Sequence, residues 1–289
     1  MSQQYDATWS DAAKQYQSTV GAISFQAAIE LTGMATTLQD FTSDSQVLDV
    51  GCGPGAVTLA ILSHNPATAI EAIDTSPKML DDLATNLSKP GMPTPNVNAR
   101  AIDIHDITST YGTNRFTHIF ANFVLHVAAK SFTASVDDIY RVLKPHGILA
   151  IATFTPHSDP YLVWDRVCRI YDPAFAPPSF APDPRAWTTP GQVAAGMQTA
   201  GLVDIKSVVR RAPFPIHAVD EWAEFFFDGR NPASEAIIRP FFETHGVSKA
   251  DVKETFKQVL RDEWDGGGMC LWSLYLLLAG SCEILVRDG

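Results

Sequence analysis

The stretch VLDVGCGPG, residues 47–55, decides the fold of this chain. A short apolar run ends in glycines at alternate positions, and a helical pattern, AVTLAIL (56–62), follows at once. Glycine tolerates positive φ and carries no Cβ, so such a turn lets the backbone lie directly against a ligand. Because Gly51, Gly53 and Ala56 also satisfy the pattern of dinucleotide-binding loops, the loop predicts a nucleotide ligand without choosing which.

The sequence around this loop alternates short apolar runs with amphipathic helical patterns. The runs at 46–51, 69–74, 97–103, 117–125 and 148–154 are separated by helical stretches such as 76–87 and 131–143. Apolar strands between amphipathic helices predict a parallel sheet covered on both faces. We therefore expect a doubly wound α/β fold, whose ligands bind at the carboxyl ends of the strands. Ser76 followed by Pro77 marks a helix start.

Composition indicates an ordinary globular protein. The chain has 289 residues, 46% of them hydrophobic, and a formal net charge of −11. No run of Lys and Arg offers the basic face that a phosphate backbone needs, so we expect no nucleic-acid partner. The polar first residues, MSQQYDATWSDAAKQY, lack the apolar stretch of a signal peptide, and we expect a cytoplasmic location.

Neither a membrane span nor a metal site is indicated. The apolar stretch at 269–282 is shorter than the roughly 20 residues that a span needs, and we expect it to be a buried part of the core. The four cysteines form no CxxC pair, and no HExxH motif occurs. We expect free thiols, no disulfide scaffold and no metal.

Residues 156–190 differ from the rest in composition, with eight prolines. Between these prolines stand six aromatic residues, namely Tyr161, Trp164, Tyr171, Phe175, Phe180 and Trp187. Aromatic side chains favour burial, so this segment is predicted to form a cap over the ligand edge rather than a bare linker. The aromatics either line a site for a flat, hydrophobic substrate or only pack within the cap.

Asp74 ends the second predicted strand. A carboxylate at this position can accept hydrogen bonds from both hydroxyls of a ribose, which favours a ligand of the adenosine type. The alternative role for Asp74 is to cap the helix that begins at SPKML. NAD and S-adenosylmethionine both carry that ribose, so Asp74 does not decide between them.

Five motifs decide between these cofactors by resemblance. The segments VLDVGCGPG, AIDTSPKML, RAIDIHDI, FTHIFANFVLH and VLKPHGILAIATF resemble, in order and spacing, the class I S-adenosylmethionine-dependent methyltransferases. The likeness is strongest to the small-molecule branch related to ubiquinone biosynthesis and extends to fungal secondary-metabolite methyltransferases. The Leu-Lys-Pro-x-Gly element has no counterpart in dehydrogenases. His146 stands where the family usually has glycine, which we expect to alter a turn and to leave the cofactor site in place.

The resemblance implies a Rossmann-like sheet of seven mostly parallel strands with added helices. We expect an N-terminal helical lid (1–40), a cofactor-binding core (41–155) and the cap (156–190). The remainder of the core (191–289) then contains a helical insertion at 219–263 and the final strand.

The resemblance also implies roles for individual residues toward S-adenosylmethionine. Asp49, Gly51, Gly53 and Gly55 would hold the methionine part, with Asn122 under its amino group. The other matching positions are Asp74 at the ribose, Thr75 and Met79 near the adenine, Asp103 and the backbone of Ile104 at the adenine edge, and Tyr16 in the lid. Met79 can instead be plain core, and Asn122 a turn residue at the end of a strand.

A general base is needed only if the acceptor must lose a proton. His126 follows the fourth strand and His157 the fifth, both at the ligand edge, and histidine titrates near neutrality. Alternatively, His126 packs against the cofactor and His157 caps a turn. Further candidates are His217 and the acids of 220–228.

We therefore predict an enzyme that transfers a methyl group to a small, hydrophobic or aromatic metabolite at O, S or N. We expect it to act as a monomer or homodimer. Three other readings stay open at this point. The fold can use the cofactor for a cyclisation or isomerisation without methylation, serve as a non-catalytic partner subunit, or bind NAD.

Overall fold

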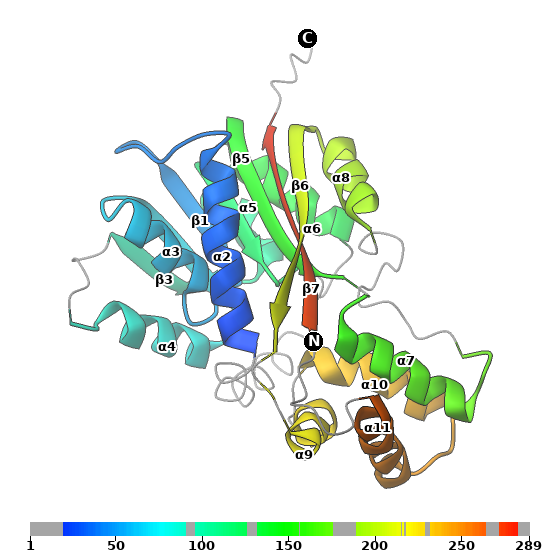
Figure 1. Cartoon of the computed structure of the whole chain (residues 1–289). Helices are drawn as coiled ribbons and strands as arrows, with labels where there is room; N and C mark the ends of the chain where they lie inside the picture. Colours follow the sequence, from blue (N-terminus) through cyan, green and yellow to red (C-terminus); the bar gives the residue numbers. More distant parts are fainter. Residues whose placement is uncertain are drawn as a thin grey trace.

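The computed structural model describes residues 20–90, 96–125, 132–155, 157–175, 189–214, 216, 218–228, 232–263 and 272–282. Its centre is a seven-stranded sheet in the order β3-β2-β1-β4-β5-β7-β6 (Figure 1). The strands are β1 (Gln46–Val50), β2 (Ala69–Asp74), β3 (Val97–Ala101), β4 (Phe116–Asn122), β5 (Leu143–Phe154), β6 (Leu202–Pro213) and β7 (Trp272–Cys282). Neighbouring strands from β3 to β5 pair in parallel, and β7 is antiparallel to both β5 and β6. This confirms the predicted α/β class.

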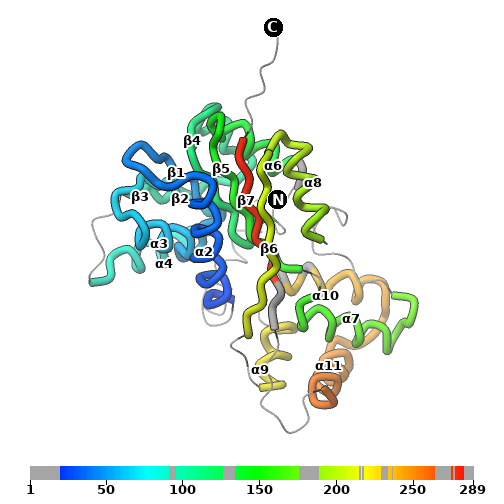
Figure 2. Tube along the Cα trace, turned by 45° about the horizontal axis from the view of Figure 1, so that its top comes forward, coloured from blue at the N-terminus to red at the C-terminus, as the bar shows by residue number. Residues whose placement is uncertain are grey.

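Helices cover both faces of the sheet (Figures 1 and 2). One face carries α2 (Val20–Thr36), α3 (Ala56–His64) and α4 (Pro77–Leu87), and the other carries α5 (Ile107–Tyr111), α6 (Phe132–Val142) and α8 (Pro190–Thr199). Two apolar clusters reflect this layering, because successive side chains of a strand point to opposite faces. Val47 joins the cluster under α2 and α3, whereas Leu48 joins the one under α5 and α6.

A helical lobe lies beyond one end of the sheet (Figures 1 and 2). It consists of α7 (Asp159–Tyr171), α9 (Val219–Ala223), the π-helix η2 (Glu224–Asp228), α10 (Pro232–Thr244) and α11 (Lys249–Glu263). Trp164 of α7 is 1% exposed, and its ring centroid lies 5.6 Å from that of Phe226 and 5.5 Å from that of Phe241. Because β5 leads directly into α7, the lobe follows the carboxyl end of the sheet.

The structure shows how some aromatic residues of the predicted cap are packed. Tyr171 and Phe175 pack edge to face on Phe241 at 5.9 and 5.2 Å, in the same cluster as Trp164. These three aromatic residues therefore pack within the lobe. Phe180 and Trp187 lie outside the described residues.

The apolar stretch near the C-terminus forms β7, between β5 and β6, and its residues Tyr275, Leu277 and Leu278 are buried, as predicted. Within the part of the chain that the structure describes, no helix is long and apolar enough to cross a membrane. Cys52, Cys168 and Cys282 are free thiols.

His146, the departure from the family pattern, has φ of 62°. His146 lies within β5, and this is the left-handed conformation that glycine adopts most easily, so the histidine is held there under backbone strain. The following residues of β5 still pair in register with β4, from Ile148 opposite His118 to Ala152 opposite Asn122.

Candidate cofactor site at the carboxyl ends of the strands

Three glycines with positive φ, Gly51, Gly53 and Gly55, shape the loop between β1 and α3. Gly51 has φ of 61°, and a Cβ built on it would lie 2.4 Å from Cγ2 of Val124. Gly53 has φ of 52°, but among the described residues no atom lies within 4 Å of its Cβ position. Gly51 thus permits close packing against the chain after β4, whereas Gly53 faces open space that a ligand can occupy.

Asp49 fixes the helix that follows this loop. The side chain is 1% exposed, and Oδ2 accepts hydrogen bonds from the backbone N–H (3.1 Å) and the hydroxyl (2.7 Å) of Thr58. Burial raises the pKa of Asp49 to about 7, the bonds from Thr58 oppose this rise, and the charge of Asp74 adds to it. Asp49 therefore contacts the start of α3 in this structure, and its predicted role toward the methionine part stays a prediction.

Asp74 ties the loops after β1 and β2 together. Its Oδ2 accepts from the backbone N–H of Gly53 at 2.9 Å, and its Oδ1 accepts from the N–H of Ser76 at 2.8 Å. Ser76, not Asp74, is the N-cap of α4, since its hydroxyl accepts from Met79 N at 3.3 Å. The helix-cap alternative for Asp74 is therefore wrong. A carboxylate offers about four lone pairs, so these bonds are compatible with a ribose hydroxyl as donor.

The residues predicted near the adenine lie in the adjacent turns. Asp103 follows β3, and its Oδ1 accepts from His105 N at 2.9 Å, capping the short 3-10 helix η1 (Ile104–Asp106). Ile104 and Met79 are buried, and Thr75 is half-buried. Asp74 and Ala101 are register partners in β2 and β3, so all these turns leave the same edge of the sheet.

Asn122 ends β4 at this edge and is 8% exposed. Its Nδ2 donates to the carbonyl and the hydroxyl of Ser24 in α2, whereas its Oδ1 is buried without a hydrogen-bond partner among the described residues. A buried acceptor without a donor is uncommon in folded proteins. It fits a ligand that brings a donor, such as an ammonium group.

The structure tests the remaining predicted positions only in part. Tyr16, His126 and His217 lie outside the described residues. His157 lies in the turn between β5 and α7, with an exposed side chain. Two acids of the stretch 220–228 are engaged in ion pairs of the lobe, Asp220 with Lys257 at 3.1 Å and Asp228 with Lys253. Across the described ranges, no group of His, Cys, Asp and Glu could hold a metal ion.

Several residues of this edge escaped the sequence reasoning. Thr58 lies in the first turn of the helix after the glycine loop, where its hydroxyl can reach back to Asp49 before the loop. This position could have been noticed in the sequence. Ser24 is 98 positions from Asn122, and no local pattern connects them. His105 and Asp138, whose Nδ1 and Oδ2 lie 3.0 Å apart, join the turn after β3 to α6 and were likewise missed.

This edge of the sheet lies in a region that matches a known protein family. A family model described as "Methyltransferase domain" matches residues 47–147, which run from β1 through the start of β5. Over these residues the chain carries a methyltransferase domain. The cofactor of this domain is S-adenosylmethionine. The acceptor oxygen Oδ1 of Asn122 and the open face of Gly53 fit this cofactor.

Curated relatives match part of this chain. The carboxy-S-adenosyl-L-methionine synthase of Shewanella sediminis is 35% identical over 124 residues, which are 40% of this chain and 49% of that protein. The malonyl-[acyl-carrier protein] O-methyltransferase of Halalkalibacterium halodurans is 33% identical over 113 residues, or 39% of this chain and 40% of that one. The chain thus spans about half the length, or less, of these curated relatives.

Solved structures share the whole fold. The YcgJ protein of Bacillus subtilis superposes with a TM-score of 0.55 at 16% identity, covering 88% of this chain and 97% of that one. The [4+2]-cyclase SpnF superposes with a TM-score of 0.52 at 18% identity, covering 89% and 82% of the two chains. At such identities the likeness shows the Rossmann-like fold of the domain.

Proposed function

We propose that this chain is an S-adenosylmethionine-dependent methyltransferase acting on a small, hydrophobic or aromatic metabolite at O, S or N. The proposal rests on the groups that meet at the carboxyl edge of the sheet. Three groups lie at the carboxyl ends of neighbouring strands of the matched methyltransferase domain. They are the open face of Gly53, the carboxylate of Asp74, and Oδ1 of Asn122, to which no described residue donates.

Each part of this edge has a role toward the cofactor. The loop with Gly51, Gly53 and Gly55 would lie against the methionine part, and Asp74 would accept from the ribose hydroxyls. Asn122 Oδ1 would accept from the ammonium group, while Asp49 would support the loop through Thr58. The adenine would lie between the turns that carry Thr75, Met79, Asp103 and Ile104, and Tyr16 would cover the site from the N-terminal segment.

When bound, the sulfonium cofactor supplies the methyl group for an in-line displacement. The protein's work is then to align the acceptor and to exclude water. Phe123 follows Asn122 with φ of 55°, and its ring stacks on Phe154 at 4.2 Å. An aromatic residue held in the left-handed region is uncommon, and such strain concentrates at functional sites. This aromatic pair supports an apolar acceptor.

The proton of the acceptor, where it has one, would pass to a histidine. His157 is exposed in the turn after β5, at the carboxyl edge, so it is accessible to a ligand there. His126 follows β4 by sequence and stays the second candidate base. A cytoplasmic location, a role in secondary metabolism and a monomeric or dimeric state are further parts of the proposal, which rest on the sequence alone.

A second candidate function is a reaction that uses the bound cofactor without methylating an acceptor. One curated relative is named a carboxy-S-adenosyl-L-methionine synthase and one solved structure a [4+2]-cyclase. These two names are the reason for considering a reaction without methyl transfer.

Incubation with methyl-labelled S-adenosylmethionine and a panel of phenols, thiols and amines separates the two. We expect label in an acceptor and one S-adenosylhomocysteine released per product. Product formed without S-adenosylhomocysteine would replace methyl transfer by the second function. Absence of cofactor binding would contradict both.

A further inference from the structure

The two sides of the Asn122 amide lie in different surroundings. Nδ2 is 3.1 Å from the carbonyl oxygen of Ser24 and 3.0 Å from its hydroxyl oxygen. Oδ1 is buried, and no described residue donates a hydrogen bond to it. Both side chains are removed from solvent, since Ser24 is 4% and Asn122 8% exposed.

The carbonyl of Ser24 decides which side of the amide faces α2. A carbonyl oxygen can only accept, so the group of Asn122 that faces it must be the NH₂ and not the oxygen. The hydroxyl of Ser24 adds a second acceptor on the same side. The amide is thereby held with its oxygen turned away from Ser24, and that oxygen loses its hydration without gaining a donor from any described residue.

Asn122 lies beside the loop proposed for the methionine part of the cofactor. The preceding residue, Ala121, is the register partner of Val50 at the end of β1. Two residues further on, Val124 is the side chain that a Cβ on Gly51 would meet. An ammonium group bound by this loop brings three donors to the neighbourhood of Oδ1.

We propose that Ser24 is a positioning residue of the cofactor site. By accepting from Nδ2, it presents Oδ1 of Asn122 to the ammonium group of S-adenosylmethionine. This inference rests on the proposed function and deepens it, because it makes the affinity for the amino-acid part depend on α2, a helix outside the matched domain.

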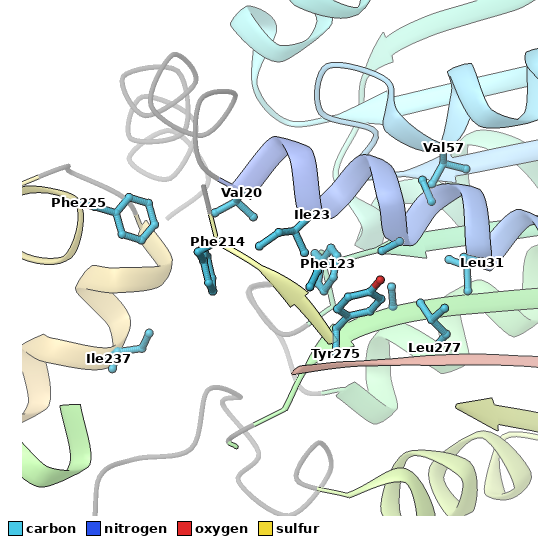
Figure 3. Packing of buried hydrophobic residues seen from close by; sticks show 14 of the residues in the cluster. Val20, Ile23, Leu31, Val57, Phe123, Phe214, Phe225, Ile237, Tyr275 and Leu277 are labelled. Atoms are coloured by element: carbon cyan, nitrogen blue, oxygen red, sulfur yellow. The ribbon is translucent and has the colours of Figure 1, made fainter. Parts of the chain in front are cut away.

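The helix is placed firmly enough for this role. Its residues Ile23, Ala27 and Leu31 are buried against the sheet, and Figure 3 shows Val20 and Ile23 on the side of Phe123 and Tyr275. Toward the other end of the helix, Glu30 pairs with Arg210 of β6 at 2.5 Å. Ser24 is therefore held between two anchored turns of one helix.

The test compares two ligands. S-adenosylhomocysteine carries the amino group, and 5′-methylthioadenosine keeps the adenosine and the thioether but lacks the amino-acid part. For Ser24→Ala, which keeps the helix, we expect affinity for S-adenosylhomocysteine to fall about fivefold, the size of one hydrogen bond, with affinity for 5′-methylthioadenosine unchanged. The matched control is Thr32→Val, because the hydroxyl of Thr32 is also buried in α2 but has no hydrogen-bond partner in the described part of the chain. This variant should change neither affinity.

The outcomes separate the inference from the proposed function. Equal losses for both ligands, or no loss for either, would overturn the role of Ser24 while leaving the proposed function standing. A wild-type protein that binds neither ligand would overturn both. A double-mutant cycle supplies the second variant, since Ser24→Ala should have no further effect on S-adenosylhomocysteine once Asn122→Ala has removed the amide. Additive losses would contradict the proposal.

Discussion

The carboxyl edge of the sheet and the helical lobe are held together by different forces. At the edge, the contacts are polar and involve the backbone, as where Asp74 accepts from the N–H groups of Gly53 and Ser76. In the lobe, the contacts are apolar and join distant segments, as where Trp164 packs on Phe226 and Phe241. The comparison indicates that the edge serves ligand binding and the lobe serves stability. Substitutions in the two regions should therefore affect the two properties separately.

The largest expected effect lies in the lobe. Trp164→Ala should lower the free energy of unfolding by about 3–5 kcal/mol, because it removes a buried indole from a cluster of phenylalanines. Denaturant unfolding measures this loss, and calorimetry on the folded variant should find the affinity for S-adenosylhomocysteine unchanged. Leu162→Ala on the same helix, at a side chain that is 40% exposed, should change stability by less than about 0.5 kcal/mol. Equal effects of the two would break the comparison.

At the edge, two glycines should respond differently to one methyl group. Gly51→Ala should cost about 2–4 kcal/mol of stability, because the positive φ is strained and the new Cβ meets Val124. Gly53→Ala should cost only about 1–2 kcal/mol, from the backbone strain. Gly53→Ala should nevertheless lower the affinity for S-adenosylhomocysteine at least about tenfold, because the new methyl group fills the space open to the ligand. Unfolding curves and calorimetry test both, and a Gly53→Ala variant with wild-type affinity would place the ligand elsewhere.

Asp49 should make stability depend on pH. Burial raises the pKa of this carboxyl in the folded state to about 7, above its value in the unfolded chain. The folded state therefore holds the proton more tightly, and the associated stability is present at low pH and lost as the pH rises toward and through 7. Relative to Asp49→Asn, which keeps a neutral group, the wild type should lose about 3–4 kcal/mol between pH 4 and pH 8. A constant difference between the two proteins would contradict this.

The smallest expected effect is a gain. Gly33 lies inside α2 with no described atom within 4 Å of its Cβ position, so alanine fits there without a clash. Gly33→Ala should raise the melting temperature, corresponding to about 0.5–1 kcal/mol, through helix propensity alone. S-adenosylhomocysteine affinity should stay the same. A loss of stability here would mean that glycines of this chain are retained for reasons that the structure does not show.

The same division explains what the sequence could predict. The strands, the loop with Gly51 and Gly53, and the turn at Ser76 are specified by neighbouring residues, and the structure has them where the local pattern indicated. That β7 is a buried part of the core followed from its apolar composition, which suits a strand covered on both faces, but its place between β5 and β6 did not.

What joins distant segments could not be predicted in this way. The contact of Ser24 with Asn122 and the packing of Trp164 on Phe241 depend on tertiary placement, which leaves no periodic signal. The aromatics of the cap illustrate the limit, because burial in a lobe and contact with a substrate favour the same residue types. For Trp164, Tyr171 and Phe175 the structure favours packing.

The most direct test of the account is a calorimetric titration with S-adenosylhomocysteine of the wild type and Asp74→Ala. We predict that the wild type binds one ligand per chain, and that the variant binds about a hundredfold more weakly, because it loses both the ribose acceptor and the bond that holds Gly53. Asp74→Asn, which keeps one acceptor oxygen, should lie between the two. An Asp74→Ala variant with wild-type affinity, or a wild type that does not bind, would contradict a cofactor site at this edge.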